Sequence, residues 1–314
     1  MDEVFHTSDR VPREELRALL VRSDGPGLAH LALLLPLLIG GGLATIHLGA
    51  AGSPLWPLAA TITGVALLTF FPALHEAGHG TAFRTPWLND AVTWLAAILM
   101  LEGPTFFREF HWEHHRQTQD RARDPEIAAA PALLDPWPSN PLTYLALASG
   151  QALLVGKAMF TIGCALMPSA AAWEKVFPYV RPRMRRRVAW ECRLVLAFLV
   201  GGVWAGLTYV PGFAYLLVAW PIAHVLMGFY LMAEHTGLAN EGSQLHRTRT
   251  IESNAAVRWL MWNMPYHAEH HAYPAVPFHQ VPALHRRLQP ALENTVRGYL
   301  AFHAEALRRA FGGR

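Results

Sequence analysis

The stretch His267-Ala-Glu-His270-His271 is one of three short histidine clusters that decide the fold of this chain. The other two are His75-Glu-Ala-Gly-His79 and His111-Trp-Glu-His114-His115. Imidazoles three or four residues apart project from one face of a helix. Neutral imidazole is the commonest protein ligand for a transition metal and suits iron, copper and zinc alike. The repeated spacing therefore predicts a metal centre that the three clusters build together.

The composition around these clusters is that of a membrane protein. Of the 314 residues, 52% are hydrophobic and only 16% are charged, whereas charged residues make up about 25% of an ordinary soluble domain. The net charge of +3 gives no reason to expect a nucleic-acid partner. The N-terminus carries Asp2, Glu3 and Asp9 rather than a basic segment, so we expect no signal peptide.

Long apolar runs predict four membrane-spanning helices. Residues 28–50 and 55–74 are each long enough to cross roughly 30 Å of hydrocarbon, and only a tight turn joins them. Residues 194–233 form one uncharged stretch that is broken at Pro211-Gly212, which predicts a second hairpin. The fold class that we expect is an all-α integral membrane protein with two transmembrane hairpins, interfacial helices and a cytosolic helical cap that carries the histidines.

Two further apolar segments, 91–107 and 143–167, are interrupted by polar residues and glycines. If the three clusters share one site, an even number of crossings must separate each pair of them. We therefore expect each segment to enter and leave the membrane by the same face, or to lie in the interface. A short amphipathic helix is expected near residues 12–20.

Basic residues indicate the orientation. The segment 173–193 is rich in arginine, whereas the two hairpin turns carry no basic residue. The positive-inside rule then places the clusters on the cytoplasmic side of the inner membrane. We expect a single domain over 1–314, divided into a cytosolic segment (1–27), a first hairpin (28–74), the first two clusters with a basic loop (75–193), a second hairpin (194–233) and a cytosolic cap (234–314).

A ninth histidine belongs with the eight in the clusters. His235 ends the fourth expected span at the depth where His75 ends the second. Nine imidazoles are too many for one tetrahedral zinc. Two irons are the economical interpretation, because oxidation of an unactivated C–H bond needs a redox-active metal and dioxygen.

Acidic residues inside or beside the clusters are candidates for orienting the ligands. A carboxylate that accepts the outer N–H of an imidazole fixes its tautomer. The candidates are Glu76, Glu113, Glu234 and Glu269. Salt bridges with neighbours such as Arg108 and Arg116 are the equally weighted alternative. Asp120 and Asp124 are expected to orient arginines rather than to act as ligands.

The remaining histidines have weaker signals. His224 lies three helical turns before His235 and would either line a substrate cavity or form a hydrogen bond in the core. His246 is the best of the others for a site role, because it lies in a loop. His30 and His47 are expected to reach the interface. Those expected at the surface are His6, His279, His285 and His303. Cys164 and Cys192 are interpreted as small buried hydrophobic residues.

The arrangement of HxxxH, HxxHH and HxxHH around two membrane hairpins resembles the membrane fatty acid desaturase and hydroxylase superfamily. The likeness runs from about Phe71 to Leu288 and includes Thr-Ala-Phe-Arg84, Arg-Asp-Pro-Glu126 and Tyr266-His-Ala-Glu-His-His-Ala-Tyr-Pro274. The resemblance implies a non-haem di-iron oxidoreductase of lipid metabolism with four spans under a cytosolic cap. It also implies the metal ligands, which are His75, His79, His111, His114, His115, His267, His270, His271 and, as the ninth, His235.

Two departures from the family pattern bear on the reaction. The first cluster begins His-Glu, which also occurs in relatives that hydroxylate alkanes, whereas His-Asp is frequent in acyl desaturases. Leu231 stands where some acyl-CoA desaturases place an asparagine. We expect desaturation of a fatty acyl or lipid substrate, with hydroxylation of a lipid, alkane or small amphiphile on the same site as the alternative.

Two other functions compete with this interpretation. His75-Glu76-Ala-Gly-His79 matches the HExxH of zinc metalloproteases, with Glu76 as general base, although the other clusters would then have no role. A metal carrier or scaffold is the second alternative, but transporters place polar residues within their spans.

The reaction needs an external electron donor, which is expected to be a ferredoxin, a rubredoxin or a cytochrome. Arg185, Arg186 and Arg187 are a candidate docking surface for an acidic carrier of this kind.

Overall fold

The computed structural model describes residues 11–128 and 140–312. Within these residues the regular structure is helical except for two short strands, β1 (Thr250–Ile251) and β2 (Thr295–Val296), which form a small parallel pair. Four helical segments in this part of the chain are long and apolar enough to cross a membrane. The prediction of an all-α integral membrane protein is therefore confirmed.

The first hairpin closely follows the prediction. Helix α2 (Gly25–Ala50) is the first span, and α3 (Trp56–Leu68) and α4 (Phe70–Gly78) together form the second. The two spans pack against each other, and the hydroxyls of Thr45 and Thr63 lie 3.2 Å apart between them. Because α4 continues beyond residue 74, His75 lies in the last turns of the span rather than after it.

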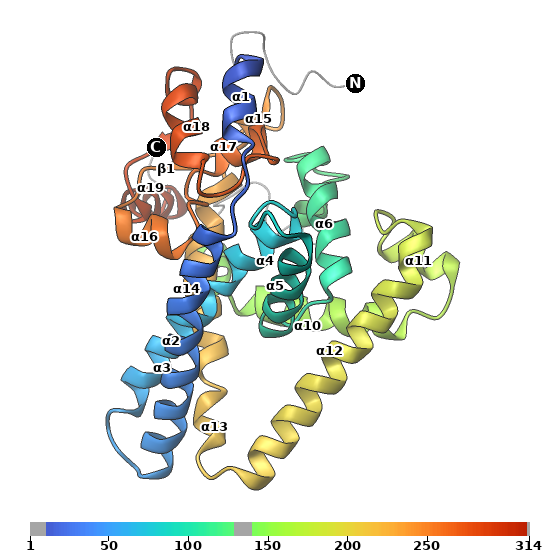
Figure 1. Cartoon of the computed structure of the whole chain (residues 1–314), viewed down its shortest axis with the longest axis vertical. Helices are drawn as coiled ribbons and strands as arrows, with labels where there is room; N and C mark the ends of the chain where they lie inside the picture. Colours follow the sequence, from blue (N-terminus) through green and yellow to red (C-terminus); the bar gives the residue numbers. More distant parts are fainter. Residues whose placement is uncertain (1–10, 129–139, 313–314) are drawn as a thin grey trace.

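The second hairpin consists of α12 (Pro182–Tyr209), the short α13 (Phe213–Leu216) and α14 (Ala219–His235). It turns at Gly212, as predicted, with a φ of +83° and with Ile46 O only 2.3 Å from where a Cβ would lie. Its two legs diverge from this turn, so that α14 packs against α3 whereas α12 leans towards α10 (Gln151–Leu166) (Figure 1). The basic segment is not the loop that we expected, because it contains α11 (Ala170–Val176) and the first turns of α12.

The two ambiguous apolar segments are bent helix pairs. Helices α5 (Pro86–Leu99) and α6 (Pro104–Gln117) meet at 95°, and α9 (Pro141–Ala148) and α10 meet at 58°. A pair bent in this way is either a broken span or a segment that enters and leaves by one face, so the expected absence of a net crossing stays a prediction.

Close contacts hold the two bent pairs in place. At the second bend Gly150 has a φ of +64°, and a Cβ there would overlap the carbonyl oxygen of His224 at 1.6 Å. Lys157 on α10 forms a buried ion pair with Glu102 at the first bend. Charged groups at membrane depth are costly unless they are paired, so this contact ties the middle of α10 to the first bend.

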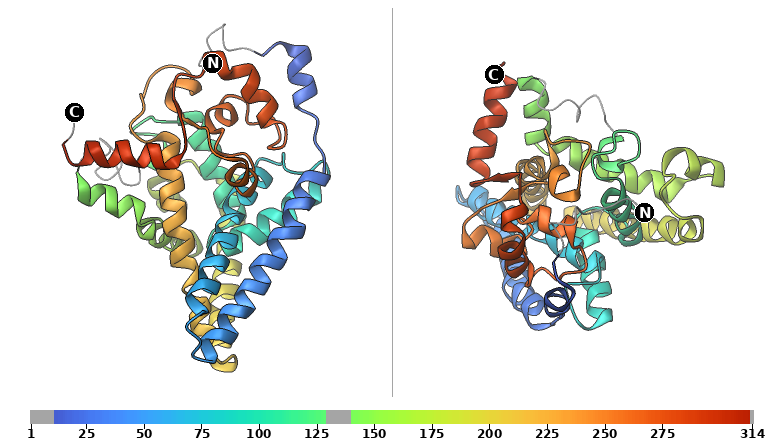
Figure 2. Two further views of the ribbon diagram at one scale, coloured as in Figure 1. Left: turned by 90° about the vertical axis from the view of Figure 1, so that its left-hand side faces the viewer. Right: turned by 90° about the horizontal axis from the view of Figure 1, so that it is seen from above.

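A cap of short helices covers the end of the spans opposite the two hairpin turns (Figures 1 and 2). The cap consists of α1 (Arg13–Leu19), α7 (Pro125–Ala128), α15 (Gln244–Arg247), α16 (Ala255–Leu260), α17 (His267–Ala272), α18 (Val281–Leu288), η2 (Gln289–Ala291) and α19 (Tyr299–Ala310). Helix α1 confirms the predicted amphipathic helix. Val276, Val281 and Leu284 are among the buried residues that pack α17 against α18.

Candidate metal centre

The ends of four helices meet between the spans and the cap. Helix α4 supplies His75 and, at its C-terminal boundary, His79, and α14 supplies His235 as its last residue. Helix α6 carries the second cluster and α17 the third. All nine histidines singled out in the sequence therefore come together. They fall into two groups, each able to hold a metal ion.

The first group contains His75, His79, His111, His115 and His270. The Nε2 atoms of His79 and His111 lie 2.9 Å apart, and those of His111 and His115 lie 3.0 Å apart. The Nε2 atom of His270 lies 3.2 Å from both His79 and His115. His75 Nε2 is buried without a hydrogen-bond partner. The five rings thus direct the same nitrogen towards a common point.

The second group contains His114, His235, His267 and His271. The Nε2 atom of His235 lies 3.1 Å from that of His114 and 2.8 Å from that of His267. The ring of His271 lies 4.5 Å from that of His267, and its Nε2 atom has no hydrogen-bond partner. This group therefore has the same convergent arrangement, with one imidazole fewer.

The spacing of the nitrogens fits ligation of a metal ion. Two nitrogens about 2.0–2.1 Å from one ion lie about 2.9 Å apart at a right angle and about 3.4 Å apart at the tetrahedral angle. The observed Nε2 separations of 2.8–3.2 Å are closer to the right angle. Five imidazoles in the first group also exceed the four ligands of a tetrahedral zinc.

The outer nitrogens of several rings are held so that Nε2 is free to bind. His235 Nδ1 lies 3.2 Å from the carbonyl oxygen of Arg247, which can only accept, so Nδ1 carries the proton. His75 Nδ1 lies 3.1 Å from Glu76 Oε1. His271 Nδ1 lies 3.3 Å from Thr118 Oγ1. A proton on Nδ1 leaves the Nε2 lone pair for a metal.

Burial keeps most of these imidazoles neutral. It lowers the pKa of His79 to about 3. It also holds the pKa of His270 and of His271 well below the usual range, with neighbouring histidines adding to the effect. Neutral imidazole is the form that binds metal.

His114 is the exception. Burial lowers its pKa, but the carboxylates of Asp124 and Glu126 outweigh burial and raise it to about 9. The same negative charge would favour a cation at the second group.

Two of the four acidic candidates lie behind the ligands. Glu76 contacts His75 and lies 3.7 Å from His270 Nδ1, and Glu234 Oε1 lies 3.4 Å from His267 Nδ1. Because Glu76 is on the Nδ1 side of these rings, it is poorly placed to act as the general base of an HExxH protease. The zinc protease alternative is therefore not supported.

The other two acidic candidates have different roles. Glu113 pairs with Arg116 at the surface, which is the salt-bridge alternative. Glu269 accepts from Thr250 Oγ1 at 2.6 Å and forms a buried pair with His285. Among the residues described, neither Glu113 nor Glu269 makes a hydrogen bond to a histidine of the three clusters.

Sequence reasoning missed Asp124. Its Oδ1 lies 3.0 Å from His114 Nδ1, and its two oxygens accept from the backbone N–H groups of Gln119 and Glu126. Burial would raise the pKa of Asp124, but His114 and these N–H groups lower it, so the carboxylate is charged. The signal was an aspartate before a proline (Asp124-Pro125), which can accept from the first turn of α7.

The remaining histidines mostly have structural roles. His224 is fully buried and bonds through Nδ1 to Trp220 O at 2.8 Å. His246 caps α15 through Ser243 and pairs with Glu293. His285 and His303 are buried, so their expected surface positions are wrong. His6 lies outside the described residues, and Cys164 and Cys192 are buried, as predicted.

Comparisons with known proteins agree with this geometry. Residues 51–303 match the fatty acid desaturase family. A chloroplastic omega-6 fatty acid desaturase of Glycine max is 26% identical over 249 residues, which cover 75% of this chain and 56% of that protein. An sn-1 oleoyl-lipid 12-desaturase of Arthrospira platensis is 25% identical, covering 74% and 69%. A beta-carotene 4-ketolase of Haematococcus lacustris is 25% identical, covering 79% and 65%.

The chain matches little more than half the length of the chloroplastic relatives, with 56% of the Glycine max protein and 54% of the Brassica napus protein covered. The family match, in contrast, extends from the first hairpin turn through all three clusters to α19. The second, third and fourth spans and the convergent histidines are the features that this match covers. On that basis the chain belongs to the fatty acid desaturase family.

Proposed function

We propose that this protein is a membrane-bound oxidoreductase that uses two irons, dioxygen and an external electron donor to desaturate a fatty acyl or lipid chain. The observation that carries the proposal is the division of nine histidines into two adjacent metal-binding groups. Membership in the desaturase family indicates an oxidoreductase and generally implies iron. The ligands would be the five histidines of the first group and the four of the second.

Bound iron would supply what imidazole and carboxylate cannot, which is the reduction of dioxygen and the oxidation of an unactivated C–H bond. The residues of the chain position that chemistry at the membrane. His75 and His235 lie in the last turns of two spans, so the centre is at the depth that an acyl chain in the bilayer can reach. Phe107 stacks on His111 with ring centroids 5.2 Å apart and excludes water from one side of the first group.

The same arrangement supports a cytoplasmic orientation. The turns of both hairpins, at residues 51–55 and 210–212, contain no basic residue, whereas arginines are frequent at the end where the cap lies. The positive-inside rule would place that end, with the centre, in the cytoplasm.

Hydroxylation is the second candidate. It is favoured by the His75-Glu76 beginning of the first cluster and by the similarity to a beta-carotene 4-ketolase, whose 25% identity equals that of the Arthrospira platensis desaturase. Whether the substrate is desaturated or hydroxylated would depend on where its carbons lie relative to the centre, to within a fraction of an ångström.

Isotope-resolved mass spectrometry of lipids from expressing cells grown under labelled dioxygen tests the proposal. Wild type would be compared with His270→Ala and, as a matched control, with His47→Ala, whose histidine is exposed at the far end of α2. A lipid that loses two hydrogens without gaining label supports desaturation, and one labelled oxygen identifies a hydroxylase. Identical lipids in wild type and His270→Ala, with no iron in the purified protein, would refute both.

A further inference from the structure

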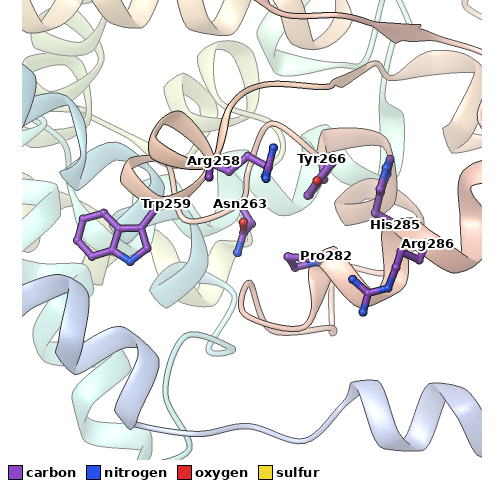
Figure 3. Close-up of a pocket in the computed structure, with 8 residues that line it drawn as sticks. Arg258, Trp259, Asn263, Tyr266, Pro282, His285 and Arg286 are labelled. Atoms are coloured by element: carbon purple, nitrogen blue, oxygen red, sulfur yellow. The ribbon is translucent and has the colours of Figure 1, made fainter.

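A pocket of about 350 Å³ opens on the surface of the cap beside the third histidine cluster (Figure 3). Arg258 and Trp259 come from α16, His285 and Arg286 come from α18, and Tyr266 immediately precedes α17. Among the described residues, those that line the pocket include two arginines and no carboxylate. The pocket is therefore a concave site for a negatively charged group.

The inner wall of the pocket leads directly to the metal-binding histidines. The rings of Tyr266 and His285 stack with centroids 4.3 Å apart, and His285 forms a buried pair with Glu269. Tyr266 precedes His267 of the second group, and Glu269 precedes His270 of the first group. Each histidine group therefore contains a residue whose sequence neighbour lies in the pocket wall or directly behind it.

The arginines of α12 are less suitable for docking than the sequence suggested. Of the three arginines singled out in the sequence, Arg186 is exposed. Arg185 is buried and donates to Val180 O and Glu174, and Arg187 pairs with Glu191. The start of α12 also lies on the opposite side of the molecule from α16 (Figure 1).

We propose that the pocket between Arg258 and Arg286 is the docking site for an acidic, soluble one-electron carrier protein, a carboxylate of which lies between the two guanidinium groups. This inference rests on the proposed function, because an oxygenase of this kind needs an external reductant. An acyl chain is a poorer occupant because the large apolar side chains behind the pocket, those of Trp262 and Phe278, are fully buried in the core and do not line it. The pocket wall at this point is the polar Asn263, whose side chain donates to Phe278 O at 3.1 Å.

In each docking event one electron would pass from the reduced carrier to the centre, and the oxidised carrier would then leave. Two such electrons and two protons balance one desaturation, in which dioxygen and two substrate hydrogens become two water molecules.

The test measures equilibrium binding of the full-length protein in nanodiscs to a plant-type [2Fe–2S] ferredoxin as the acidic probe. Arg258→Glu with Arg286→Glu should weaken binding by about tenfold or more and abolish most of its dependence on salt. The matched control, Arg183→Glu with Arg186→Glu, makes the same charge change at exposed positions of α12 and should bind as wild type does.

Anaerobic reduction of the centre by dithionite should proceed equally in all three proteins. If the pocket variant binds ferredoxin as tightly as wild type, or if the α12 variant alone loses binding, the docking proposal is wrong. It is also wrong if the pocket variant loses binding to phosphatidylglycerol vesicles but not to ferredoxin. Because binding is measured without turnover, a protein that docks ferredoxin but oxidises no lipid would refute the proposed function and leave the docking site standing.

Discussion

The two histidine groups differ in how charge and ligands are distributed. Within residues 11–128 and 140–312, the first has five imidazoles and one carboxylate, that of Glu76, behind two of them. The second has four imidazoles, with Asp124 behind His114 and Glu234 behind His267. The group with fewer imidazoles therefore has more carboxylates behind it, and the charged Asp124 would attract a cation where fewer donors are available. Substitutions that affect one group and spare the other can test this difference.

Loss of a ligand should have the largest effect. His115→Ala removes an Nε2 from the first group and His271→Ala removes one from the second. Each should lower the iron content by about one ion per chain and reduce oxidation by more than the roughly 10–100-fold that the loss of an outer partner costs. Metal analysis with Mössbauer spectroscopy would identify which site has emptied.

His47→Ala is the control for both variants. Retention of both irons in His115→Ala would contradict the assignment of His115 to the first group.

The buried ion pair between Lys157 and Glu102 should affect both groups alike, because it fixes the bend from which α6 carries histidines of both. Lys157→Met alone leaves an unpaired buried charge and should destabilise the protein by about 3–5 kcal/mol. Lys157→Met with Glu102→Leu should recover most of the loss. Thermal unfolding in nanodiscs measures both variants, and equal melting temperatures for wild type and Lys157→Met would contradict the structural role of the pair.

Replacement of the acids should separate the groups. Asp124→Asn should weaken metal binding at the second group by about 10–100-fold, and Glu76→Gln should do so at the first. Competition with a chelator, followed by counting the ions retained, measures this. Release of the same ion by both variants would contradict the placement of Asp124 behind the second group and of Glu76 behind the first.

Removal of Glu113 should have the smallest effect. Its partner Arg116 is more than half exposed, and exposed ion pairs contribute at most about 1 kcal/mol. Glu113→Gln should therefore keep wild-type iron content and activity. A loss of metal in this variant would show that proximity in sequence, rather than the contacts described, decides which acids matter.

The sequence predicted what depends on local periodicity. Helical spacing within each cluster predicted that its imidazoles share one face, and the structure brings all nine histidines together. The expectation that residues 91–107 and 143–167 make no net crossing of the membrane stays a prediction, because each is a bent helix pair that could also be one broken span. The sequence could not show which carboxylates contact the cluster histidines, because those contacts are tertiary. Glu269 lies inside a cluster yet turns towards His285, whereas Asp124, nine residues beyond its cluster, reaches His114. Hydropathy likewise gave no sign that the basic segment begins α12 as a helix.

Each histidine group contains residues from α6 and α17. Helix α4 completes the first group and α14 completes the second. Since α17 follows all four spans in the sequence, neither group is complete until the ribosome has made residues 267–271. Iron would therefore be loaded late in biogenesis, after all four spans have entered the membrane. Until then the imidazoles of the earlier clusters are open to competing metals, so the supply of iron at that moment would decide how much active protein a cell obtains.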